Sequence, residues 1–106
     1  MSVPTPSALR LRAALRENRT GLAAFLTRYG ATNPRLFGSV ARGEAGDDSD
    51  IDVLVDLAPG AGNELLRVAG LSEELSLLIG ARVDVVAESL LRERVSATAL
   101  ADAVAV

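Results

Sequence analysis

The segment "IDVLVDL", residues 51–57, restricts the fold of this 106-residue chain more than any other feature. Ile51, Val53 and Val55 alternate with two aspartates and a leucine, and a period of two residues is typical of a β-strand. Asp50 and Asp52 then project from the same face of the strand, with Cα atoms roughly 7 Å apart according to the strand rise. One short strand is therefore expected to contribute to the core and to a cluster of charge.

Helical patterns precede this strand. Thr5 and Pro6 are typical of an N-cap and a first helical turn, and apolar residues at three- and four-residue spacing follow. They predict an N-terminal helical segment over residues 6–29, with Gly30 as its C-terminal cap. An interruption of this segment near residues 18–21 is an alternative to one continuous helix.

The rest of the chain alternates strand and helix. The patterns predict a short strand over 35–37, a turn or two of helix after Gly38, the strand over 51–57, an amphipathic helix over 65–79 closed by Gly80, a valine-rich strand over 81–87, and a C-terminal helix over 88–104. This order indicates one compact α/β domain, with its core over residues 33–87, the part in which any catalytic residues are expected.

Composition narrows the chemistry. The chain has no cysteine and no histidine, which excludes disulfides, thiolate metal sites and the usual general base at neutral pH. Catalysis would have to use carboxylates, hydroxyls, arginines and an added metal. The net charge of -3 argues against a binding face for duplex nucleic acid. No apolar run approaches the ~20 residues of a membrane helix and the N-terminus lacks a secretory signal, so we expect a cytoplasmic protein.

Three carboxylates are candidate metal ligands. Asp50 and Asp52 begin one strand, and Asp84 lies among valines in another. Oxygen ligands of this kind suit Mg²⁺, and carboxylates from two adjacent strands can hold a pair of ions for phosphoryl or nucleotidyl transfer. The alternative for Asp84 is an ion pair with Arg82 or Arg35.

A candidate phosphate site lies before these carboxylates. Gly38 at a strand-to-helix corner lets a phosphate approach the backbone, Ser39 offers a hydroxyl, and Arg42 adds a fixed charge. The other acidic residues nearby are interpreted structurally: Glu44, Asp47 and Asp48 as a solvated loop, and Asp56 as a cap at the strand end.

The segment "LFGSVARGEAGDDSDIDVLVDL", residues 36–57, resembles the signature of the minimal nucleotidyltransferases of the DNA polymerase beta superfamily. The signature comprises Gly-Ser, an Ala-Arg-Gly turn, a pair of aspartates, and a later aspartate between apolar residues. Gly38, Ser39, Asp50, Asp52 and Asp84 match its positions. The resemblance implies a compact polymerase-beta-like core with a short mixed sheet flanked by helices.

The resemblance also implies a function. ATP would bind through Mg²⁺, with two ions expected, and AMP would pass to an acceptor hydroxyl, whose deprotonation Asp84 would assist. Minimal members are often paired with a small helical HEPN-type toxin, which they neutralise by attaching AMP, by binding, or by both. A binding-only antitoxin is thus the alternative to an enzyme, and self-association is also expected because so small a core leaves apolar helix surface exposed.

Overall fold

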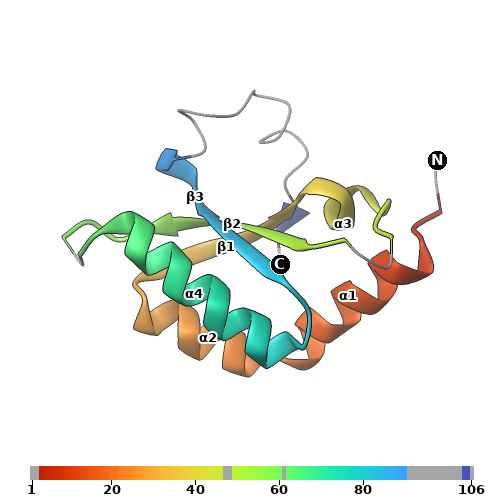
Figure 1. Cartoon of the computed structure of the whole chain (residues 1–106), viewed down its shortest axis with the longest axis horizontal. Helices are drawn as coiled ribbons and strands as arrows, with labels where there is room; N and C mark the ends of the chain where they lie inside the picture. Colours follow the sequence, from red (N-terminus) through yellow and green to blue (C-terminus); the bar gives the residue numbers. More distant parts are fainter. Residues whose placement is uncertain (1–2, 47–48, 61, 91–103, 106) are drawn as a thin grey trace.

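A computed structural model describes residues 3–46, 49–60, 62–90 and 104–105 of the chain (Figure 1). The helices are α1 (Pro6–Glu17), α2 (Arg19–Arg28), α3 (Gly38–Arg42) and α4 (Glu64–Ile79). The strands are β1 (Ala31–Phe37), β2 (Ile51–Leu57), β3 (Val83–Ala87) and β4 (Val104–Ala105). The α/β class predicted from the sequence is confirmed.

The strands form one mixed sheet in the order β3-β2-β1-β4. β2 pairs with β3 in parallel and with β1 in antiparallel orientation, and β1 pairs with β4 in antiparallel orientation. Helix α4 provides the crossover that a parallel connection between β2 and β3 requires. The short mixed sheet implied by the family resemblance is therefore present.

The core lies between one face of the sheet and helices α1, α2 and α4, which lie together below the sheet in Figure 1. Ile51, Val53 and Val55 of β2 contribute to it, as the alternation predicted, and Leu71 and Leu75 of α4 pack there without exposed surface. Because successive side chains of a strand point to opposite faces, Asp52 and Asp56 belong to the other face of β2.

Capping residues set the helix bounds much as the sequence predicted. The Thr5 hydroxyl accepts a hydrogen bond from the Ala8 amide, with proline at the first turn of α1. The helical segment breaks at Asn18, between α1 and α2. Gly80 closes α4 at a φ of 77°, in the left-handed region that favours glycine. No helix in the described ranges has the length and apolarity to cross a membrane.

Two predicted boundaries were wrong. β1 begins at Ala31 and not at residue 35, with an irregular register between Thr32 and Arg35 where Asn33 has a φ of 53°. The predicted core, which began at residue 33, therefore omitted the first residues of this strand. Asn33 and Pro34 interrupt the strand pattern in the sequence, and the bulge accommodates them.

The C-terminal helix predicted over 88–104 was wrong at its end. Residues 88–90 are helical, whereas Val104 lies in β4 and pairs with Leu36 of β1. The part of the prediction over 91–103 lies outside the described residues. Pairing with an existing strand outweighs the helix propensity of so short a segment, because it satisfies backbone groups at the edge of β1.

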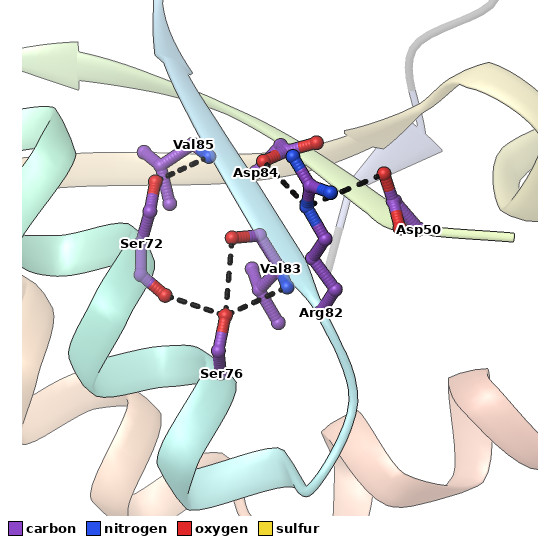
Figure 2. A network of polar contacts seen from close by, with 7 residues as sticks. All are labelled: Asp50, Ser72, Ser76, Arg82, Val83, Asp84 and Val85. Atoms are coloured by element: carbon purple, nitrogen blue, oxygen red, sulfur yellow. Dashed lines mark hydrogen bonds and ion pairs between the residues drawn. The ribbon is translucent and has the colours of Figure 1, made fainter.

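The edge of the sheet at β3 is covered by hydroxyl groups of α4 (Figure 2). Ser72 Oγ accepts the Val85 amide at 2.8 Å, and Ser76 Oγ accepts the Val83 amide at 2.8 Å. Ser76 also lies 2.7 Å from the Ser72 carbonyl oxygen, to which it donates. The outward amides of Val83 and Val85 are thus satisfied by side chains of α4 instead of by another strand.

Candidate active site

The three aspartates predicted as metal ligands come to the same end of the sheet. Asp52 and Asp84 are paired residues of the parallel strands β2 and β3, and Asp50 immediately precedes β2. Paired residues of adjacent strands project to the same face. The strand pairing therefore gathers carboxylates that are separated by more than thirty positions in the sequence.

The charge at this end is poorly compensated around Asp52. Burial, and after it the negative charges of Asp84 and Asp50, together raise the pKa of Asp52 to about 6, with Arg42 acting in the opposite direction. Each of these neighbours lies close enough to affect Asp52. The cluster is therefore a site that favours a cation or a proton.

Arg82 lies between the other two carboxylates (Figure 2). Its Nε atom is 3.6 Å from Asp50 Oδ2 and 3.7 Å from Asp84 Oδ1. The arginine side chain is 74% exposed, so water screens both ion pairs and the pairs are weak. The alternative interpretation of Asp84 as an ion-pair partner of Arg82 is correct for this state, whereas Arg35 pairs elsewhere.

The three aspartates lie at one end of the sheet, but their carboxylates do not converge on one point. Among the described residues, no group of three acidic side chains has the spacing to hold a metal ion as it stands. Mutual repulsion and the intervening guanidinium of Arg82 both oppose a closer approach. An ion held by all three carboxylates would require them to move toward it.

The predicted phosphate corner directly adjoins Asp52. Gly38 begins α3 with a φ of 73°, and a Cβ atom at this position would collide with the carboxylate of Asp52. Glycine is therefore required for two reasons, its backbone conformation and the space taken by the aspartate. Ser39, the next residue of the helix, is partly buried.

Arg42 lies on the same short helix and has a partner that the sequence analysis missed. Its Nε atom donates to Glu44 Oε2 at 3.1 Å, although Glu44 was interpreted as loop solvation. In the sequence, Arg42 and Glu44 are separated only by Gly43. This spacing does not predict an ion pair unless the left-handed turn at Gly43 is known. Asp47 and Asp48, assigned to the same loop, lie outside the described residues.

Asp56, at the far end of β2, has a different environment. It accepts from Asn33 Nδ2 at 3.2 Å and from Arg35 Nη2 at 2.8 Å. The hydrogen bond from Asn33, supported by Arg35, lowers the pKa of Asp56 below its ordinary value. The predicted cap at the strand end is thus an ion pair across β1 and β2.

Known proteins resemble this chain over most of its length. The family profile of the nucleotidyltransferase domain matches residues 20–106. The protein adenylyltransferase MntA of Thermococcus cleftensis is 42% identical over 77 residues, which are 73% of this chain and 76% of that protein.

Two solved structures share the fold. One, provisionally described as a minimal nucleotidyltransferase, is 42% identical with a TM-score of 0.71, over 89% of this chain and 93% of the other. The second, a toxin–antitoxin crystal structure with AMP-PNP, is 25% identical with a TM-score of 0.55, over 74% of this chain and 60% of the other. The chain belongs to the nucleotidyltransferase domain family, as one of its minimal members, and is an enzyme of the nucleotidyltransferase class.

Proposed function

We propose that this chain transfers AMP from ATP to a hydroxyl group of a protein partner, and that the partner is a small helical toxin of the HEPN type. Similarity to a protein adenylyltransferase supports the protein acceptor. Similarity to a toxin–antitoxin structure with AMP-PNP supports the adenine nucleotide and the toxin. In the transfer, the acceptor oxygen bonds to the α-phosphorus, the bond from this phosphorus to the bridging oxygen breaks, and pyrophosphate leaves.

The observation that carries the proposal is the contact between Gly38 and Asp52. It brings the phosphate corner against the carboxylates, so a triphosphate at Gly38 and Ser39 would have its reacting phosphorus beside them. Arg42 would supply positive charge to the phosphate oxygens.

The carboxylates have the chemistry of a magnesium site. The raised pKa of Asp52 and the position of Arg82 both indicate that the cluster favours a cation. Asp50, Asp52 and Asp84 would hold Mg²⁺, with Arg82 moving away from two of them. Bound there, Mg²⁺ would neutralise charge on the phosphates. Asp84 would accept the proton of the acceptor hydroxyl.

The second candidate is an antitoxin that acts by contact alone. Its support is the outer surface of α4, where Leu65, Leu66 and Leu77 are 55%, 75% and 79% exposed. This helix covers the sheet face opposite to the aspartates. A toxin, or a second copy of the chain, could bind these leucines without touching the carboxylates.

The variant Asp84→Asn separates the two candidates, because it removes a charge and preserves shape. We expect it to bind the toxin but to add no AMP, measured as the absence of the AMP mass increment on the toxin. Asp56→Asn is the matched control, since it makes the same change outside the site. If Asp84→Asn still neutralises the toxin fully in cells at matched expression, inhibition is by contact.

A further inference from the structure

Helix α3 cannot hold its own position. It has five residues, and isolated helices shorter than about 12 residues are marginal in water. Yet it carries Gly38, Ser39 and Arg42, the groups assigned to the phosphates. Their orientation toward Asp52 must therefore be fixed by contacts with other elements.

Arg12 of α1 provides such a contact. Its guanidinium donates to the carbonyl oxygen of Val40 through Nε at 3.2 Å and Nη2 at 3.0 Å, and to that of Ala41 through Nη2 at 2.7 Å. These carbonyls belong to the last turn of α3, where the helix supplies no following-turn amides for them, although the Val40 carbonyl also accepts from the Gly43 amide at 3.1 Å. A cation at this end also interacts favourably with the helix dipole.

The start of α1 holds the chain just after α3. The Thr5 amide donates to the Gly43 carbonyl at 2.8 Å, and the Thr5 hydroxyl donates to the Ala45 carbonyl at 2.6 Å. Gly43 has a φ of 75°, and a Cβ there would lie 3.2 Å from Pro4. Helix α1 and its N-cap thus bind α3 and the residues that follow it at two places. Arg12 binds Val40, 28 positions away in the sequence, and Thr5 binds Ala45, 40 positions away.

We infer that Arg12 is a positioning residue for nucleotide binding, which acts by holding the turn of Gly38, Ser39 and Arg42 in its binding geometry. The inference rests on the proposed function. Without Arg12, the carbonyls of Val40 and Ala41 lose a charged donor and the short helix frays. Nucleotide binding must then order the turn, and this cost weakens affinity. Arg12 itself binds carbonyls at the end of the helix away from Gly38 and Ser39.

The test compares Arg12→Ala and Arg12→Lys with Arg16→Ala, which removes the same charge from an exposed position of the same helix. We expect Arg12→Ala to weaken the calorimetric affinity for ATP with Mg²⁺ by about 10- to 100-fold, the range for groups that orient a binding group. In a transfer assay KM for ATP should rise with little change in kcat. Arg12→Lys should recover part of the affinity, and Arg16→Ala should match the wild type.

Hydrogen exchange gives a readout that does not depend on activity. The amides of Gly43 and Glu44 donate to the carbonyls of Val40 and Ser39 within this turn, and they should exchange faster in Arg12→Ala. Wild-type affinity and exchange in Arg12→Ala would overturn the inference. If that variant does not fold, the same result in Arg12→Lys would do so. Absence of ATP binding by the wild type would instead refute the proposed function, while the exchange rates still test the contact.

Discussion

Asp52 and Asp56 lie on the same face of β2, four residues apart, and their environments are opposite. Burial and two neighbouring carboxylates raise the pKa of Asp52 to about 6. A hydrogen bond from Asn33, together with Arg35, lowers the pKa of Asp56. One aspartate has its partners within the fold, whereas the other lies beside two like charges, and Arg42 is the group that lowers its pKa among the described residues. This difference separates a charge that stabilises the fold from one that is available to the proposed metal site.

The largest expected effect is on activity. Asp52→Asn should reduce nucleotidyl transfer by more than about 100-fold, because Asp52 is proposed as a direct metal ligand and the loss of such a ligand exceeds the 10- to 100-fold effect of losing a group behind one. Asp56→Asn should change the rate less than about twofold, since it is remote from the phosphate corner. Steady-state rates at saturating ATP provide the comparison. Equal losses of rate in the two variants would mean that the different environments of Asp52 and Asp56 do not affect nucleotidyl transfer.

The second effect is on the stability of the metal-free protein at pH 7.5, and it should differ in sign. Asp52→Asn should raise the free energy of unfolding by about 1 to 2 kcal/mol, after allowance for the water that still reaches the carboxylate. Asp56→Asn should lower it by up to about 1 kcal/mol, because its ion pair is partly exposed. Urea titration measures both values. A loss of stability in Asp52→Asn would contradict the interpretation of Asp52 as uncompensated.

The third effect is the pH dependence of stability. Between pH 3.8 and about 6 the folded state holds the Asp52 proton that the unfolded state releases, so the free energy of unfolding falls as pH rises. The contribution of Asp56 is present above its unfolded pKa and is lost as pH falls through its lower folded pKa.

Unfolding at a series of pH values should show about 1 to 2 kcal/mol of stability lost from pH 4 to pH 6.5 through Asp52. Asp52→Asn should lack this component, which makes it the control. An identical pH profile in the variant and the wild type would show that the pKa of Asp52 is not raised.

The smallest effect should come from Arg82. Arg82→Gln should change the stability of the metal-free protein by less than about 0.5 kcal/mol, because both of its ion pairs are exposed. Arg35→Gln is the matched change at the other end of β2, and it should cost more because Arg35 is only 19% exposed. Thermal unfolding in parallel tests the order. A larger loss of stability for Arg82→Gln than for Arg35→Gln would mean that Arg82 stabilises the fold and is not free to leave the carboxylates.

The sequence predicted the fold well where the signal was local. Thr5, Gly80 and the alternation of β2 each indicate an element through their own neighbours. The pairing of Val104 with β1 depends on contacts nearly seventy positions apart, which no local pattern contains. The apolar residues that predicted the amphipathic helix over 65–79 included Leu65, Leu66 and Leu75. Leu75 is buried together with Val68 and Leu71, whereas Leu65 and Leu66 are exposed.

The candidate site shows the same limit. Spacing indicated that Asp50 and Asp52 share a face, and the parallel register then brought Asp84 beside them. The spacing of residues in the sequence gave no indication of the arginine side chains that connect helices and strands. Arg12 binds carbonyls of α3, and the buried Arg67 donates to the carbonyls of Tyr29, Gly30 and Ala58. A guanidinium that binds backbone carbonyls requires no particular residue type at the other end, so these pairs leave no pattern in the sequence.

The hydroxyls of Ser72 and Ser76 on the β3 edge also restrict how partners can bind. An extended peptide usually joins a sheet by donating to and accepting from the free backbone groups of an outer strand. On β3 the amides of Val83 and Val85 are already engaged, and a peptide would have to displace both serines. Docking by strand addition, and the growth of fibrils from this edge, are therefore disfavoured. A protein that binds beside Asp84 is therefore not expected to do so by adding a strand to β3.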